Sequence, residues 1–209
     1  MRDREDNHYL AASIESIDPV GIHSSDSYQF MPAVTLTDRE FQNLREAAIH
    51  ISRYLKLTGA ISIKFALDPT SYAFYILEVN PFASDSMSMA SMGLGYSLFE
   101  QGVELQLGRS LEHLPHPLLK DLKAVYEPSL DYIFFKIPIF SDAAKNARLN
   151  TQIQSYGAVY GFGKRIDEAY QQALETIKDK NLLTILPEEM SDDELIQKIA
   201  RHMPHRLFY

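Results

Sequence analysis

Two apolar runs joined by a short turn constrain the fold of this 209-residue chain more than any other feature. The runs AISIKFAL (60–67) and AFYILEV (73–79) are separated by the turn sequence DPTSY. Short apolar runs that are rich in β-branched and aromatic residues, with Pro and Asp between them, predict a β-hairpin. In the first run the apolar residues alternate with Ser62 and Lys64, so we expect one face of the hairpin to be buried.

The rest of the chain mixes helical and extended patterns. The clearest helix is predicted to follow Thr37, which can cap it, with Glu40 at the capping-box position. We expect further helices over 94–108, 165–180 and 191–203, and short strands over 8–16, 28–34, 129–140 and 151–164. Pro138 is expected to cut the strand in 129–140, the glycines of 151–164 are expected to make tight turns, and a Ser/Met-rich loop is expected after Pro81. Hairpins among helices predict an α+β fold with a mostly antiparallel sheet and flanking helices.

The composition narrows the classes of function. Hydrophobic residues make up 45% of the chain and charged residues 23%, which is typical of a globular protein. The formal net charge of −8, without a Lys/Arg-rich block, disfavours a surface for nucleic acid. The chain has no cysteine, which excludes disulfides and thiolate zinc sites. It has no membrane-length apolar run and no signal-peptide core, so we expect a cytoplasmic protein that binds neither membrane nor nucleic acid.

The end of the second apolar run carries the residues most suited to chemistry. Glu78 and Asn80 are two positions apart, so on a strand they point to the same face. Their oxygens are hard ligands that suit magnesium held together with nucleotide phosphates. Counting from the turn, Lys64 is expected to lie opposite Glu78. The residues alone leave two interpretations open: a magnesium–nucleotide site, or a surface strand end with a cross-strand Lys–Glu pair.

Six segments together resemble a known family. They are SIESIDPVGIHSSDS, MPAVTLTDREFQNLREAAI, IKFALDP, ILEVNP, YEPSLDYIFFKIP and LNTQIQSYGAVYGFGK. In this order they are similar to the large subunit of carbamoyl-phosphate synthetase. They resemble most the first of its two ATP-grasp halves, which forms carboxyphosphate, and EPSLDY and LNTQIQS are the segments that favour the first half over the second.

The resemblance implies a division of the chain into two parts. Residues 1–180 would be the C-terminal portion of an ATP-grasp domain, and 181–209 the beginning of a helical oligomerisation domain. The family's glycine-rich lid would precede Met1, so the chain resembles a fragment, and we expect these residues alone to be inactive. Whether the chain belongs to an active enzyme is left open. We expect its apolar end, RLFY, to pack against further helical residues or another chain.

The resemblance also implies which residues form the site. Glu78 and Asn80 would hold the metal on ATP, and Lys64 stands where the family has a Gln ligand. Phe82 and Asp85 stand where the family has arginines that would face bicarbonate and the transferring phosphate. His23 would lie in the nucleotide pocket, near the adenosine. Two more of the family's lysine positions are changed here, to Met92 and Glu100.

The functional prediction therefore has one main form and two alternatives. The resemblance implies part of a carbamoyl-phosphate synthetase large chain that uses ATP, bicarbonate and glutamine-derived ammonia with magnesium or manganese, in arginine or pyrimidine biosynthesis. A glutaminase small subunit and a homo-oligomer are the implied partners. One alternative is a non-catalytic structural or regulatory derivative, for which Lys64, Phe82 and Asp85 argue. The other is an ATP-grasp ligase for a different carboxylate.

Overall fold

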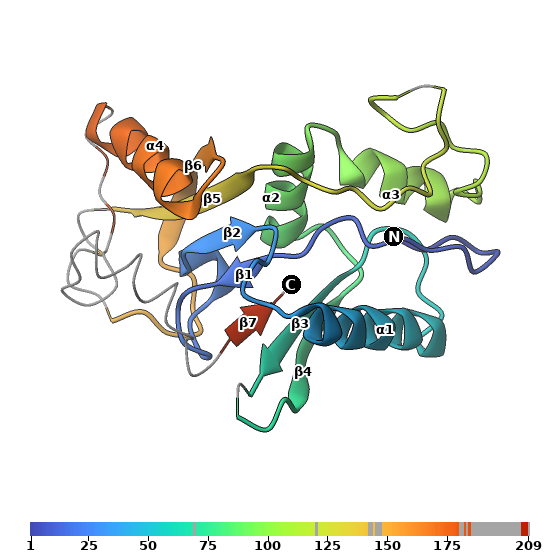
Figure 1. The fold of residues 1–209 in the computed structure, drawn as a ribbon, viewed down its shortest axis with the longest axis horizontal. Helices are drawn as coiled ribbons and strands as arrows, with labels where there is room; N and C mark the ends of the chain where they lie inside the picture. Colours follow the sequence, from blue (N-terminus) through green and yellow to red (C-terminus); the bar gives the residue numbers. More distant parts are fainter. Residues whose placement is uncertain are drawn as a thin grey trace.

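The structure is a computed structural model that describes residues 1–68, 70–119, 121–141, 144, 148–179, 182, 184 and 206–208. Within these residues the chain forms strands and helices in a mixed order (Figure 1). The elements are β1 (Glu15–Ser16), the short 3-10 helix η1 (Ser24–Asp26), β2 (Gln29–Met31), α1 (Asp38–Tyr54), β3 (Ser62–Leu67), β4 (Phe74–Asn80), α2 (Asp85–Leu94), α3 (Leu98–Gln106), β5 (Ile133–Phe140), β6 (Ser155–Gly163), α4 (Ile166–Asp179) and β7 (Arg206–Phe208). Each helix in this described part is too short or too polar to cross a lipid bilayer.

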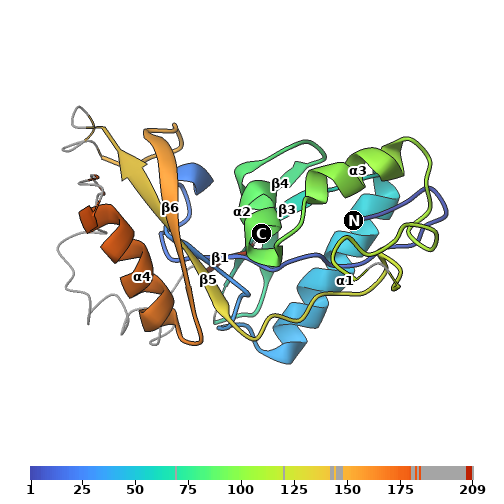
Figure 2. The ribbon, with the colours of Figure 1, turned by 90° about the horizontal axis from the view of Figure 1, so that it is seen from above.

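One sheet runs through the molecule and the helices pack on it (Figures 1 and 2). The described strands follow the order β4-β3-β7-β1-β2-β5-β6. Every pairing among them is antiparallel, as the sequence pattern predicts. Helix α4 lies against β5 and β6 at one end of the sheet, and α1, α2 and α3 lie toward the other end (Figure 2). The predicted α+β class is therefore confirmed.

Helix α1 begins as the sequence predicts. The Thr37 hydroxyl accepts a hydrogen bond from the backbone N–H of Glu40, and the Glu40 carboxylate accepts one from the backbone N–H of Thr37 at 2.7 Å. This reciprocal capping box satisfies two N–H groups that the first helical turn would otherwise leave unpaired. The buried side of α1 places Leu44 in one cluster with Ile63 and Phe65 of β3. Helix α1 therefore covers the apolar face of the predicted hairpin.

The far end of the sheet holds the largest apolar cluster. Every residue of β5 is buried, and Phe135 contacts the rings of Tyr28 and Tyr170 edge-on. Pro138 does not cut this strand, contrary to the sequence prediction, and it pairs with Ala158 of β6. The reason is its position, because β2 pairs with Phe134, Phe135 and Lys136 but not with Pro138. A missing N–H at this point therefore removes no hydrogen bond from the β2 side.

The glycines of residues 151–164 do not form turns within the strand, as the sequence had suggested. They belong to the continuous strand β6, where two of them admit helix α4. A Cβ on Gly161 would come within 2.1 Å of the Ala169 carbonyl oxygen, and one on Gly163 within 2.8 Å of the Ala169 nitrogen. The glycines are therefore needed for the close approach of helix to strand, because no larger residue leaves room for the helix backbone.

The Ser/Met-rich residues after Pro81 form a helix, which corrects the prediction of a loop. Ser84 caps α2 through a hydrogen bond from the backbone N–H of Met87, and Gly95 ends the helix with a left-handed φ of 76°. Met87 and Met89 are buried in the cluster that joins α2 to the sheet. The serines obscured the helical period in the sequence because they occupy the cap and also interrupt the apolar face of the helix, where Ser86 is buried beside Met87.

Two strands differ from the predictions in extent or partner. The strand predicted over 8–16 is reduced to the two residues of β1. The C-terminal residues Arg206–Phe208 pair as β7 between β1 and β3, so their backbone completes this sheet, where we had expected packing against further helices or another chain. The helix predicted over 191–203 lies outside the described residues, and the assignment of 181–209 to a second domain stays a prediction.

Candidate functional site

A cleft opens where the hairpin, the η1 turn and the start of α2 meet. It is lined by His23, Ser24, Ser25, Ser62, Lys64, Glu78, Asn80, Ser84, Asp85, Ser86 and Ile153. The structure thus brings together five of the predicted site residues, from segments up to 62 positions apart in the sequence, His23 to Asp85. Its volume is about 210 Å³, which is less than the roughly 300–1,000 Å³ of typical ligand pockets. The described residues therefore form a small polar cleft with space for part of a nucleotide.

A β-bulge aligns the charged residues of the hairpin. Near the turn Leu67 pairs with Phe74, and continuing this register would place Lys64 opposite Leu77. The register shifts between Lys64 and Phe65, so Lys64 pairs with Glu78 instead. The predicted Lys64–Glu78 juxtaposition is therefore confirmed, and the bulge is its cause, because one extra residue on β4 turns the following side chains to the other face.

Burial and the neighbouring carboxylate act in opposite directions on Lys64. Burial lowers the pKa of its ammonium group, and the charge of Glu78 raises it, with burial the larger effect. Both side chains line the cleft, one on each strand of the hairpin. The ammonium group of Lys64 neutralises part of the negative charge of the Glu78 carboxylate. Less negative charge is then left to attract a metal ion.

Asn80 lies at the mouth of the cleft and already has one partner. Its Oδ1 accepts a hydrogen bond of 3.0 Å from the backbone N–H of Phe82. This local bond fixes the direction of the amide group and leaves a second lone pair on the oxygen. Opposite it, Ser62 pairs with Asn80 in the sheet, and the Ser62 hydroxyl lies 3.2 Å from that of Ser84. Asn80 is thus oriented at the start of the turn that leads into α2.

His23 caps η1 and lines the cleft. Its Nδ1 accepts a hydrogen bond of 3.1 Å from the backbone N–H of Ser25, which caps η1, and its side chain also lines the cleft. Asp26, fully buried behind it, accepts hydrogen bonds from the backbone N–H groups of Gln154 and Ser155. These bonds tie the η1 turn to the start of β6 and to the residue before it.

Asp85 contributes a second carboxylate to the cleft. It is the first residue of α2, and the Ser25 hydroxyl donates a short hydrogen bond to its Oδ2. The N-terminus of a helix favours an anion because of its unpaired N–H groups, and Asp85 supplies one from the chain itself. This carboxylate stands at a position where the family resemblance implies an arginine.

Lys136 is a cation near the cleft that the sequence analysis missed. It is 3% exposed, and its ammonium group donates hydrogen bonds to the Ser24 carbonyl at 2.9 Å and to Gln29 Oε1 at 3.2 Å. Burial lowers its pKa to about 8, and the carboxylates of Asp85, Asp26 and Asp18 oppose this shift. A lone lysine in the otherwise apolar run IFFKIPIF was the signal in the sequence, because lysine is almost never fully buried without a partner.

Three of the named positions lie outside the cleft lining. Phe82 is 74% exposed, and Met92, on α2, is 47% exposed. Glu100 is an exposed residue in the first turn of α3. Among the residues described in the lining, Lys64 is the one lysine or arginine, and the two carboxylates are Glu78 and Asp85. The cleft itself is therefore acidic, and the buried ammonium of Lys136 lies behind its wall.

The donor set bears directly on a metal. No group of three or more His, Cys, Asp or Glu side chains that could hold a metal ion occurs in the described part of the chain. Glu78 and Asn80 offer two hard oxygen donors, which fit a magnesium ion whose other ligands come from nucleotide phosphates and water. Lys64 cannot serve as a third ligand while it is protonated, because an ammonium group has no lone pair.

Solved structures of low identity share this fold. The biotin carboxylase–βγ-ATP complex of Campylobacter jejuni superposes with a TM-score of 0.52 at 15% identity, over 93% of this chain and 50% of that one. An ADP complex of PurK, N5-carboxyaminoimidazole ribonucleotide synthetase, gives 0.52 at 16% identity, over 81% of this chain and 49% of that one. This chain therefore spans about half the length of these two proteins. The likeness shows that the fold is part of an ATP-grasp fold.

A family model places the chain more specifically. The model of the carbamoyl-phosphate synthase L chain, ATP binding domain, matches residues 1–114. The matched range includes η1, both strands of the hairpin and the start of α2, and so every cleft residue except Ile153. More than half of the 209 residues are thus covered by one family, and this chain belongs to the family of carbamoyl-phosphate synthase L-chain ATP-binding domains.

Proposed function

We propose that this chain forms one wall of the metal–ATP cleft in a carbamoyl-phosphate synthase-type ATP-grasp ligase. The observation that carries the proposal is the bulged hairpin, which brings Glu78 and Asn80 to one cleft with His23. In the longer protein, ATP would phosphorylate bicarbonate, and ammonia from a glutaminase subunit would complete carbamoyl phosphate. Family membership and the donor set of the cleft support this assignment.

Different residues of the cleft would bind different parts of Mg–ATP. Glu78 and Asn80 would hold a magnesium ion that bridges the nucleotide phosphates and neutralises their charge. His23, on the η1 turn, would contact the adenosine side of the nucleotide. Because these groups form a small cleft on one side only, we expect these 209 residues to bind the nucleotide weakly and to catalyse no carbamoyl-phosphate formation by themselves.

Calorimetric titration of the chain with Mg–ATP tests the proposal. Glu78→Gln removes a charged metal donor and should lower the affinity for Mg–ATP by about tenfold or more. Lys64→Gln replaces the ammonium with an amide oxygen donor and should raise the affinity several-fold. The control Glu46→Gln makes the same replacement at an exposed carboxylate on α1, outside the cleft. It should leave the affinity for Mg–ATP unchanged. If the wild type and Lys64→Gln both fail to bind Mg–ATP, the nucleotide assignment is wrong.

A second candidate function is favoured by the charges of the cleft. Lys64 faces Glu78, and Asp85 occupies the start of α2, where a transferring phosphate would meet repulsion. These groups suit a derivative of the domain that keeps the fold and has lost the phosphoryl-transfer chemistry.

The two candidates differ in what a restoring change would do. The combined change Phe82→Arg and Asp85→Arg, placed in a longer protein that includes this chain, should raise bicarbonate-dependent ATP hydrolysis if the domain is a weakened enzyme. No gain, together with absent Mg–ATP binding in the parent, would favour the non-catalytic derivative.

A further inference from the structure

Lys136 connects the sheet to the wall of the cleft. In β5 it pairs with Gln29 of β2 and with Tyr160 of β6, and its side chain is buried. It shares a face of the strand with Phe134, which packs in the cluster that contains α2. From this face its ammonium group donates to Gln29 Oε1 at 3.2 Å and to the Ser24 carbonyl at 2.9 Å. One side chain therefore links β2, β5 and η1.

The Ser24 carbonyl is the acceptor that closes η1. It also accepts a hydrogen bond of 3.3 Å from the backbone N–H of Ser27, at the end of this helix. Helix η1 has three residues, and the hydrogen bonds of so short a 3-10 helix have poor geometry. His23 and Ser25, on either side of Ser24, both line the cleft. The bond from Lys136 therefore helps to fix the part of the wall that faces a ligand.

Carboxylates surround the ammonium group of Lys136 from several elements. Asp85 of α2, Asp26 of η1 and Asp18 of the segment between β1 and η1 each attract it electrostatically. Tyr160 of β6 faces the same region, and burial together with the charge of Asp85 raises the pKa of its hydroxyl. Asp26 is fully buried, and a buried carboxylate becomes costly when a cation near it is removed. The ammonium group thus balances negative charge on both sides of the η1–α2 contact.

We propose that Lys136 is a positioning residue of the nucleotide site, which holds η1 in place through Ser24 and offsets the charge of Asp85 at the start of α2. It would act without touching the nucleotide, because it lies behind the wall and outside the cleft lining. Lys136 also lies beyond residues 1–114, which the family model matches, so that match does not carry this role. The role rests on the proposed function, since it concerns the affinity for Mg–ATP.

Hydrogen exchange followed by NMR tests the link to η1 without nucleotide. Lys136→Met removes the ammonium group from the full 209-residue chain and keeps a side chain of similar length. The amide of Ser27, whose acceptor is the Ser24 carbonyl, should then exchange about tenfold faster or more. Amides that pair β5 with β6 should exchange as they do in the wild type, because Lys136→Met leaves the backbone ladder intact.

Calorimetric titration with Mg–ATP tests the effect on binding. At neutral pH, Lys136→Met should lower the affinity by about fivefold or more. In the wild type the affinity should fall as the pH rises through the pKa of Lys136, which is about 8, because the neutral amine no longer offsets Asp85. Lys136→Met should lack this fall. Burial also lowers the pKa of Lys64, but Lys64 is present in both proteins, so the comparison removes its effect.

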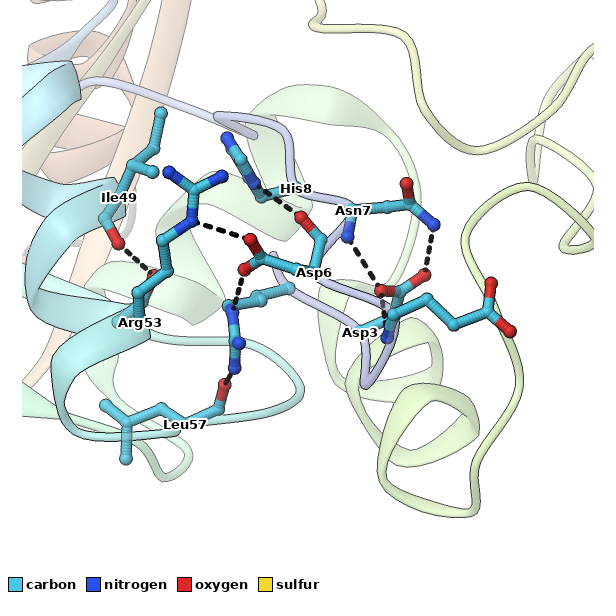
Figure 3. A network of polar contacts seen from close by, with 10 residues as sticks. Asp3, Asp6, Asn7, His8, Ile49, Arg53 and Leu57 are labelled. Atoms are coloured by element: carbon cyan, nitrogen blue, oxygen red, sulfur yellow. Dashed lines mark hydrogen bonds and ion pairs between the residues drawn. The ribbon is translucent and has the colours of Figure 1, made fainter.

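Two variants serve as controls. Ile137→Val changes the next residue of β5, which is buried on the opposite face of the strand. Asp6→Asn weakens a different polar network, outside the cleft lining, in which Arg2 and Arg53 donate to the Asp6 carboxylate at 2.9 Å and 2.7 Å (Figure 3). Both changes remove contacts from the fold, and both should leave the exchange at Ser27 and the affinity for Mg–ATP unchanged.

Two results would overturn the role of Lys136 while the proposed function stands. One is binding of Mg–ATP by the wild type and by Lys136→Met with equal affinity and the same pH profile. The other is unchanged exchange at Ser27 in Lys136→Met. If the wild type and Lys64→Gln both fail to bind Mg–ATP, the proposed function is wrong and this role falls with it. Circular dichroism checks that Lys136→Met is folded, and Lys136→Gln, which also removes the charge, replaces it if it is not.

Discussion

At the scale of single residues, the cleft is decided by a few charged side chains whose environments the sequence does not reveal. Lys64 and Glu78 face each other only because of a bulge, and Asp85 is held by Ser25. Lys136 is buried behind the η1 turn, where its ammonium supports the Ser24 carbonyl. The hydrogen bond from Lys136 to Ser24 makes this wall of the cleft sensitive to pH, because a buried ammonium is easier to deprotonate than an exposed one.

Lys136 should make the stability of the fold increase with pH in the alkaline range. Its pKa falls from the ordinary 10.5 to about 8 in the folded chain. Below pH 8 it is protonated in both states, and between pH 8 and 10.5 the unfolded chain binds a proton that the folded chain does not. The Lys136 contribution to the unfolding free energy should therefore rise by about 2 kcal/mol between pH 8 and pH 10.

Urea denaturation across this pH range measures the effect. The difference in unfolding free energy between the wild type and Lys136→Met should change in favour of the wild type as the pH rises. Lys178→Met, an exposed change in the last turn of α4, is the control and should show a constant difference. A constant difference for Lys136→Met as well would mean that its ammonium is not desolvated.

At the scale of elements, contacts between the backbones of neighbouring elements explain features that looked like breaks in the sequence. The glycines of β6 allow α4 to approach, and the serines after Pro81 cap and line a helix. Both patterns resemble turns or loops when read along the chain. In the structure they are sites where a helix packs closely or begins.

Gly161 should be far less replaceable than Gly157, although both lie in β6. A Cβ at Gly161 would stand 2.1 Å from the Ala169 carbonyl oxygen and 2.6 Å from the Ala173 nitrogen. Gly161→Ala should therefore push α4 away and lower the unfolding free energy by about 2 kcal/mol or more. A Cβ at Gly157 would have only the Ile139 Cδ1 atom nearby, at 3.7 Å. Gly157→Ala should therefore change the unfolding free energy by less than about 0.5 kcal/mol. Urea denaturation compares them, and equal losses would contradict the packing argument.

At the scale of the whole molecule, the interior strand β5 is well covered and the edge strand β4 is open. Strand β5 is buried throughout, between β2 and β6 and beneath α4, whereas most of β4 at the sheet edge is exposed. Tyr75 and Ile76 of β4 are 61% and 51% exposed. The local stability of β5 and β4 should differ accordingly, since local opening is easiest where few apolar contacts are lost.

Hydrogen exchange followed by mass spectrometry should show this gradient. Amides of β5 should exchange most slowly, near the limit set by global unfolding, and amides of β4 should exchange much faster. The α1 peptides serve as an internal reference, because α1 is capped and packs with one face only. Protection of β4 equal to that of β5 would show that the described sheet opens as a single unit.

The sequence by itself determined the local features of this protein. Alternation of apolar residues specified the hairpin, and Thr37 with Glu40 specified the start of α1, because these depend on neighbours within a few positions. The ordered motifs also identified an ATP-grasp relationship that family membership and the shared fold support at the coarser level. The roles predicted for Glu78, Asn80 and His23 in binding stay predictions, although these residues do share one cleft.

Only the tertiary structure decided the features that depend on contacts between distant segments. These include the bulge that pairs Lys64 with Glu78, the burial of Lys136 and the insertion of β7 between β1 and β3. Strand register and burial depend on which segments lie side by side, and local residue preferences do not encode that choice. The chain pattern therefore located the candidate site, whereas packing set its charge environment.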